Sequence, residues 1–257
     1  MKYILLLMTC LLLHTSVQGV SSDRRQSFLQ SVFYPIDDYI LAIQWIPKNK
    51  EFSIHGLWPN SVGEGPEYCR YKLREPNGPS EKTAIDEAYE KDLERESKDW
   101  ANLIKGMNKH WYTDWPGKTN LSFWAHEFGA HGNCYDPDRN RKDDDLNKAF
   151  FQRAVDLFKS KEVQRTLKMT VELFEEATEH KVARNKLVQK LKQTEHFDKE
   201  VIVKTANIPG GLHTVTELHF CFGKAFQPEH CEKDNNTETT MLCLAEIDEK
   251  NKKVCPQ

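Results

Sequence analysis

Residues 123–134 read FWAHEFGAHGNC, which places two histidines and a glutamate among aromatic residues just before a cysteine. Such a cluster can bind a metal, transfer protons or pack in a core. A zinc-binding helix needs two histidines four residues apart on one face. His126 and His131 are five residues apart, which separates them by about 140° around a helix. The spacing therefore disfavours zinc, and Glu127 next to these imidazoles favours proton transfer.

A third histidine lies upstream, in residues 54–59, which read IHGLWP. These residues are expected at the end of a strand that stops at Pro59. On that strand His55 would be held by rigid backbone, and Trp58 would present an aromatic face. Ordinary packing in the core remains the alternative for each aromatic residue taken singly.

Composition and termini indicate a secretory-pathway protein. In this chain of 257 residues, residues 1–19 have the short apolar run of a signal peptide, and residues 20–257 are predicted to form one domain without stable membrane insertion. The net charge of −3 disfavours a large basic nucleic-acid surface. Asn120 and Asn235 begin glycosylation sequons. The cysteines that remain after the signal peptide suggest disulfides: Cys69, Cys134, Cys221, Cys231, Cys243 and Cys255.

The hydrophobic pattern predicts an α+β domain with a central, mostly antiparallel β-sheet flanked by helices and stabilised by disulfides. No repeat or linker divides the chain. The predicted strands cover residues 39–45, 52–58, 201–206, 213–222 and 240–247. The predicted helices fall within residues 80–110, 121–131, 145–159 and 161–192.

The two histidine segments together resemble the ribonuclease T2 family of secreted or lysosomal acid endoribonucleases. HGLWP is similar to the family's first active-site segment, and FWAHEFGAHGNC to the second, usually FWxHEWxKHGxC. The resemblance extends to Gln44-Trp45, to Trp115-Pro116 and to the cysteine-bearing stretch CFGKAFQPEHC followed by MLCL.

The resemblance implies a metal-independent endoribonuclease without a cofactor. His131 would be the general base and His55 the general acid, while His126 would hold the phosphate and Glu127 would stabilise the transition state or orient the site. Trp58 and Phe123 would stack bases. The substrate would be single-stranded RNA, cleaved through its own 2′-hydroxyl to 2′,3′-cyclic phosphate ends.

DNA would be inert, because it lacks the 2′-hydroxyl. The protein would act as a monomer, outside the cell or in the endolysosomal lumen. The resemblance also implies the disulfides Cys69–Cys134, Cys221–Cys255 and Cys231–Cys243.

One departure from the family pattern bears on activity. Ala130 stands where the family usually has lysine, and loss of one transition-state donor costs roughly 10²–10³ in rate. Lys118 or Arg139 could supply a cation instead. The chain could thus be a slow ribonuclease, or a secreted glycoprotein of ribonuclease fold that acts by binding a partner or receptor.

Overall fold

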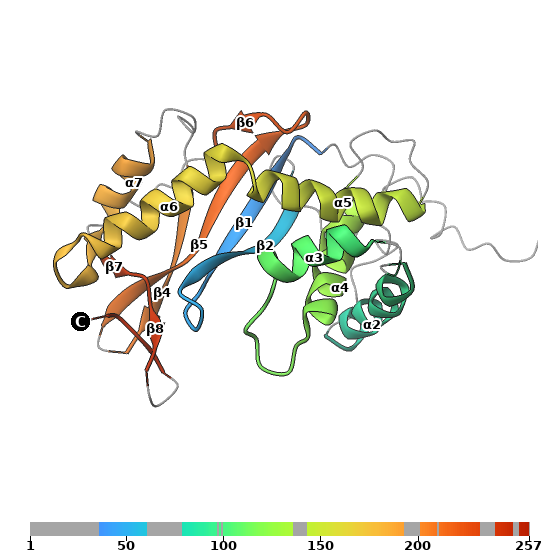
Figure 1. Ribbon diagram of the computed structural model, residues 1–257, viewed down its shortest axis with the longest axis horizontal. Coiled ribbons are helices and arrows are strands. Elements are labelled where there is room, and N and C mark those ends of the chain that lie inside the picture. Colours follow the sequence, from blue (N-terminus) through green and yellow to red (C-terminus); the bar gives the residue numbers. More distant parts are fainter. Residues whose placement is uncertain are drawn as a thin grey trace, which may run out of the picture.

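The computed structural model describes residues 36–60, 79–96, 98, 100–135, 143–192, 201–209, 211–231, 240–248 and 252–256 (Figure 1). The predicted signal peptide, Cys69, Arg139 and the sequon at Asn235 lie outside these residues. In the described part of the chain, no helix combines the length and the apolar character needed to cross a membrane.

A seven-stranded sheet forms the centre of the domain, with the order β2-β1-β5-β7-β3 and with β4 and β6 also paired to β5. The β5–β7 pair is parallel and the other pairs are antiparallel. A separate two-stranded sheet pairs β8 with β9. The strands are β1 (Asp38–Ile46), β2 (Glu51–Asn60), β3 (Val182–Ala183), β4 (Ile202–Ile208), β5 (Leu212–Gly223), β6 (Pro228–Glu229), β7 (Met241–Cys243), β8 (Glu246–Ile247) and β9 (Lys253–Val254).

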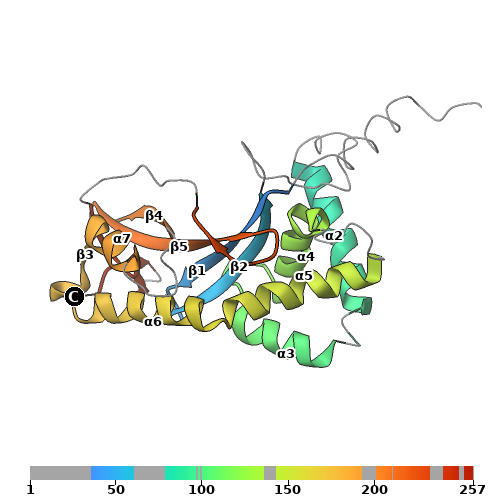
Figure 2. The ribbon, with the colours of Figure 1, turned by 90° about the horizontal axis from the view of Figure 1, so that it is seen from above.

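Helices cover the sheet and extend beyond one end of it (Figures 1 and 2). Helix α5 packs against β1 and β2, while α2 packs on α4, α3 on α5, and α6 on α7. The helices are α2 (Pro79–Glu96), α3 (Ala101–His110), α4 (Asn120–Ala130), α5 (Asp143–Phe158), α6 (Lys161–Glu175) and α7 (Arg184–Lys192).

An aromatic cluster joins the helices to the sheet. Phe150 and Phe151 of α5 are fully buried and contact Phe128 of α4 and Trp111. Large aromatic side chains bury the most apolar area per residue, so this cluster fixes α4 relative to the sheet and thereby positions the histidine segment that it carries.

The predicted α+β class with a mostly antiparallel sheet is confirmed. One predicted strand is divided. Residues 240–247 form β7 in the main sheet and β8 in the small sheet, separated by the buried residues Leu244 and Ala245. The turn at Ala245 is held by its N–H, which donates to Thr214 Oγ1 at 3.0 Å, and by its carbonyl, which accepts from Trp45 Nε1 at 2.7 Å.

Two of the predicted disulfide pairings are wrong. The disulfides are Cys221–Cys231 and Cys243–Cys255, not Cys221–Cys255 and Cys231–Cys243. Strand β5 turns back at Gly223 into β6, which brings Cys231 beside Cys221, and the β8–β9 hairpin returns Cys255 to Cys243. Cys134 is also disulfide-bonded, while its predicted partner Cys69 lies outside the described residues.

Peptide mapping distinguishes the two pairings. Complete tryptic digestion without reduction separates the four cysteines into peptides 205–224, 225–233, 234–250 and 254–257. We expect 205–224 to be linked to 225–233, and 234–250 to 254–257, in mass spectra recorded after enzymatic deglycosylation. A reduced digest is the control. Linkage of 205–224 to 254–257 would contradict the structure.

Candidate active site

A β-bulge places His55. In the β1–β2 pairing Ala42 faces Gly56 and Ile43 faces Ile54, so His55 is the extra residue of β2. Residues 55 and 58 would point to opposite faces of a regular strand. The bulge instead brings both side chains to one face, with the His55 and Trp58 ring centroids 5.2 Å apart.

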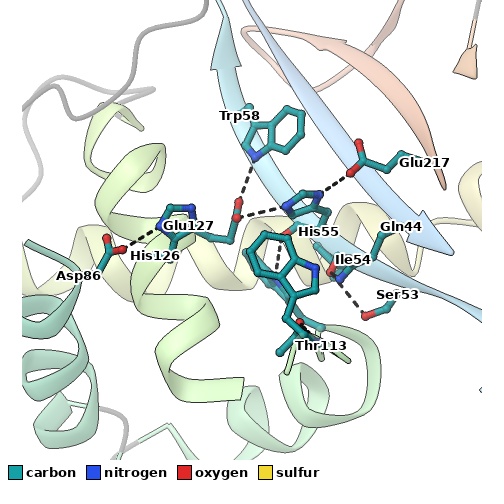
Figure 3. A network of polar contacts seen from close by, with 12 residues as sticks. Gln44, Ser53, Ile54, His55, Trp58, Asp86, Thr113, His126, Glu127 and Glu217 are labelled. Atoms are coloured by element: carbon teal, nitrogen blue, oxygen red, sulfur yellow. Dashed lines mark hydrogen bonds and ion pairs between the residues drawn. The ribbon is translucent and has the colours of Figure 1, made fainter. Parts of the chain in front are cut away.

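Side chains satisfy the backbone carbonyls at this bulge. Trp111 Nε1 donates to the carbonyl of His55 at 2.8 Å, and Gln44 Nε2 donates to the carbonyl of Ile54 at 3.3 Å. Gln44 also donates to the carbonyl of Tyr112 at 3.2 Å. These bonds replace ladder partners that the bulge removes, so the position of the imidazole is fixed from behind (Figure 3).

Helix α4 supplies the second histidine segment. Its first turn is closed by a capping box, in which Thr119 accepts from the Ser122 N–H and Ser122 accepts from the Thr119 N–H, each at 3.0 Å. The helix ends at His131, whose N–H donates to the Glu127 carbonyl at 3.0 Å. Glu127 and His131 are thus one turn apart at the end of the helix nearest β2.

Glu127 is buried, with 1% of its surface exposed. Its Oε2 accepts from Trp58 Nε1 at 3.0 Å, and its Oε1 lies 3.4 Å from His55 Nε2. Burial acts to raise the pKa of this carboxyl. The hydrogen bond and charge of His55, the charge of His131 and the Trp58 hydrogen bond outweigh burial, so that the pKa of Glu127 lies below its usual value. The carboxylate is therefore ionised.

Gly56 makes the Trp58–Glu127 hydrogen bond possible. A Cβ at residue 56 would collide with the Glu127 carboxylate and with the indole nitrogen of Trp58. The glycine of the HGLWP segment is thus required for close approach of the two side chains across the strand.

Trp58 lies among three imidazoles. Its ring centroid is 5.2 Å from each of His55, His131 and His219. The structure therefore gathers His55, Glu127, His131 and Trp58 at one place. The indole packs against these rings and donates to Glu127, while Trp58 stays partly exposed, so its role in base stacking remains a prediction.

The ring of His55 lies between two carboxylates. Nδ1 donates to Glu217 Oε1 on β5 at 2.6 Å, while Nε2 faces Glu127. Burial acts to lower the pKa of His55, but the bonds and charges of Glu127 and Glu217 outweigh it and raise the pKa to about 10. His55 is therefore an imidazolium at neutral pH.

His126 points away from this cluster towards α2. Its Nδ1 donates to Asp86 Oδ2 at 2.9 Å, and its side chain is partly exposed. The Asp86 bond raises the pKa of His126, opposed by burial and by the positive charge of Lys118, and assisted by the charges of Glu127 and Asp86. The loop before α4 thus brings Lys118 within electrostatic reach of His126.

The two predicted base-stacking residues are accompanied by a third aromatic residue. Phe123 is 1% exposed and belongs to the core, with its ring 5.7 Å from that of His55. Trp115 is 44% exposed, and its ring lies 6.1 Å from His55 and 5.8 Å from Phe123. Trp115 is thus the open aromatic surface at this side of the site.

The structure also describes the surroundings of Ala130 and Asn120. Ala130 is 3% exposed within the apolar core, so no cation occupies its position. Asn120 Nδ2, the atom that glycosylation would modify, donates to Asn108 Oδ1 at 3.1 Å. Among the described residues no group of three or more His, Cys, Asp or Glu is arranged to hold a metal ion.

Sequence reasoning missed Glu217, His219 and Asp86. Glu217 and His219 are two residues apart in a predicted strand, so their side chains share one face of the sheet, but nothing in the pattern places that face opposite His55. Asp86 belongs to a predicted helix with many charged residues, and nothing in the sequence singles out this carboxylate from its neighbours.

Comparison with known proteins now adds to this geometry. Residues 28–231 match the model of the ribonuclease T2 family. Ribonuclease DdI of Dictyostelium discoideum is 34% identical over 113 residues, covering 38% of this chain and 40% of that protein. Ribonuclease T2 protein rnst-2 of Caenorhabditis elegans is 31% identical over 181 residues, covering 65% of this chain and 54% of that protein. The chain thus spans about half or less of the length of these relatives.

A solved structure shares the fold. RNase NT, determined in complex with 5′-AMP, superimposes with a TM-score of 0.56 and 20% sequence identity, covering 87% of this chain and 98% of that chain. At this identity the likeness concerns the fold alone.

The paired charges around His55 predict how stability depends on pH. The raised pKa of His55 means that its contribution is complete below pH 6.5 and is lost as the pH rises towards about 10. The lowered pKa of Glu217 means that its contribution is present above pH 4.5 and is lost as the pH falls towards about 2. We expect the unfolding free energy to fall by on the order of a few kcal/mol as the pH rises from about 6.5 to about 10.

Urea unfolding at several pH values from about 5 to about 10 measures the loss of stability on the alkaline side. Glu217→Gln is the comparison, because it removes one of the two charges that raise the pKa of His55 and should flatten the alkaline fall. Identical pH dependence in the two proteins would contradict this prediction.

Proposed function

The chain belongs to the ribonuclease T2 family, and from this premise we propose that it is an endoribonuclease that cleaves single-stranded RNA. The observation that carries the proposal is the convergence of His55, from β2, and His131, from the end of α4, on the same indole of Trp58. Beside them lies the buried carboxylate of Glu127. Two imidazoles in one site are what transfer of an RNA phosphate to its own 2′-oxygen needs.

His131 acts as the base. It takes the proton of the 2′-hydroxyl while the 2′-oxygen bonds to phosphorus, and the bond from phosphorus to the 5′-oxygen breaks. His55, held as imidazolium by its carboxylate partners, gives the Nε2 proton to the departing 5′-oxygen. The products are a 2′,3′-cyclic phosphate and a free 5′-hydroxyl, and the scheme uses no metal.

Imidazolium groups provide the positive charge for the phosphate. The Asp86 hydrogen bond raises the pKa of His126 and so favours its charged form, and its partial exposure leaves it accessible to an anion. Charge that develops on the phosphorane is stabilised by such fixed donors. With the lysine position occupied by Ala130, we expect a slower enzyme than one that carries lysine there.

The secretory route belongs to the same proposal. The apolar leader at residues 1–19 provides the signal, and disulfides such as Cys221–Cys231 and Cys243–Cys255 form and persist in an oxidising compartment. A secreted or endolysosomal location agrees with both features.

Replacement of the proton-transfer residues tests the reaction. We expect His131→Ala and His55→Ala each to lower kcat for single-stranded RNA by roughly 10²–10⁴-fold, because each removes one proton transfer. Cleavage is followed by gel and the 2′,3′-cyclic phosphate by mass spectrometry, with EDTA present and with a DNA oligonucleotide as the inert substrate.

His180→Ala is the matched control, since His180 follows α6 and its Nδ1 contacts the Phe174 carbonyl at 3.2 Å rather than a residue of the cluster described above. Circular dichroism confirms folding of each variant. RNA cleavage that survives in His131→Ala at the wild-type rate would refute the assignment of the base.

Trp115 provides a separate test of base stacking. A base stacked on an aromatic side chain contributes about 1–3 kcal/mol, so Trp115→Ala should raise KM for short oligonucleotides roughly 5- to 150-fold with kcat little changed. Trp115→Phe keeps a π-face and should retain most of the affinity. Equal KM values for wild type and Trp115→Ala would contradict the role.

A binding glycoprotein of ribonuclease fold is the second candidate, favoured by the absence of a cation at Ala130. This candidate requires that folded wild-type protein leaves RNA intact from acid to neutral pH. It also requires that the biological effect survives replacement of His55 or His131.

A further inference from the structure

We propose that Glu217 is a positioning residue for the RNA-cleaving reaction, which locks the imidazole of His55 so that Nε2 serves the leaving oxygen. This inference rests on the function proposed above. It assigns a role to a side chain on β5 that neither histidine segment contains, and Figure 3 shows it on the opposite side of His55 from Glu127.

A bulge in β2 and a regular β1–β5 register bring the pair together across an intervening strand. His55 is the extra residue of β2 against β1. On β5, Glu217 faces Gln44 of β1 in a register that runs without a shift along the β1–β5 pair. Ala42 of β1, which lies between β2 and β5, faces both Gly56 and His219. Its small side chain adds little bulk between β2 and β5.

Both oxygens of Glu217 are held. Oε1 accepts from His55 Nδ1 at 2.6 Å, and Oε2 accepts from His219 Nε2 at 2.6 Å. His219 is itself buried against Trp58. Burial acts to raise the pKa of Glu217, but its bonds to the two histidines and their charges lower the pKa to about 2. Glu217 is therefore a fixed anion throughout the range in which RNA is cleaved.

The charged and titratable groups around His55 divide into two sides. From α4, Glu127 faces Nε2, and His131 lies across the Trp58 ring. From β5, Glu217 faces Nδ1, and His219 lies behind it. Because the 2.6 Å bond is the shorter one, Glu217 sets the ring orientation, whereas the longer 3.4 Å separation from Glu127 leaves the Nε2–H able to donate to substrate.

This arrangement also fixes the tautomer after reaction. When the Nε2–H bond breaks and the proton moves to the 5′-oxygen, the remaining proton stays on Nδ1. There it keeps its hydrogen bond to the Glu217 carboxylate. A carboxylate that orients the imidazole and stabilises its charged form is a general device of acid–base catalysis. Here the carboxylate comes from β5, which is separated from β2 by β1.

NMR of selectively labelled histidines tests the positioning role without reference to catalysis. Titration of wild type and Glu217→Gln, with His55→Gln used to assign the signal, should show that the pKa of His55 falls by at least about one unit on loss of the charge. The Nδ1–H signal should lose its downfield position. Unchanged values for both would overturn the proposal.

The pH profile of kcat/KM on a short RNA gives the functional readout. We expect the alkaline limb to move to lower pH in Glu217→Gln by at least about one unit. Glu217→Ala, which also releases the ring, should lower kcat roughly 10- to 100-fold with KM nearly unchanged. Full activity and an unshifted profile in both variants would overturn the proposal.

A matched control and a second variant keep the test decisive. Glu246→Gln makes the same chemical change at the exposed ion pair with Lys50 and should leave the His55 titration and the profile unchanged. If Glu217→Ala does not fold, Glu217→Gln retains the volume and a hydrogen-bond acceptor. If wild type cleaves no RNA, the proposed function fails, while the NMR titration still decides the role of Glu217.

Discussion

The Glu127 carboxylate lies inside the protein with an indole and an imidazole as its partners, and an ionised carboxylate is stable there only while it keeps them. That requirement binds α4 to β2, because the acid comes from the helix and both partners come from the strand. The aromatic cluster around Phe150 and Phe151 then holds α4 from the other side. The active-site geometry and the packing of the domain are consequences of the same contact.

The sheet contributes more than a support for this contact. The bulge at His55 turns its imidazole towards Glu217, which the regular β1–β5 pairing places opposite Gln44. The result is a line of alternating charge that runs from Glu127 through His55 to Glu217, whose second oxygen accepts a hydrogen bond from His219. Such a line stabilises each member only if all are present, since removing one leaves an uncompensated charge next to the core.

Much of this could be predicted from the sequence. Alternating apolar residues indicate the long strands, and the helical period indicates α4, because these patterns reflect local burial. The histidine segments predict that His55, Glu127 and His131 lie together, and the structure brings them to one place. The bulge in β2 could not be predicted, since the sequence 54–59 is compatible with a regular strand. Without the bulge at His55, Trp58 would face away from it, and the indole would have no reason to orient Glu127.

The disulfide error and the omission of Glu217 have the same origin. Both depend on which strands the segments of the C-terminal half pair with, and residue types do not reveal this. Cys231 reaches Cys221 because β6 doubles back on β5, and Glu217 reaches His55 because β5 lies next to β1 rather than at an edge. Pairing order is a property of topology.

Gly56 shows that a residue can serve a site through the space that it leaves empty. The indole and the carboxylate meet where its side chain would stand, so a single methyl group at this position would separate them without removing any reactive group. Surveys that shorten side chains to alanine look for lost chemistry and treat alanine as the neutral baseline. At residue 56 that baseline is itself the perturbation, and its effect on the reaction would be mistaken for a defect in folding.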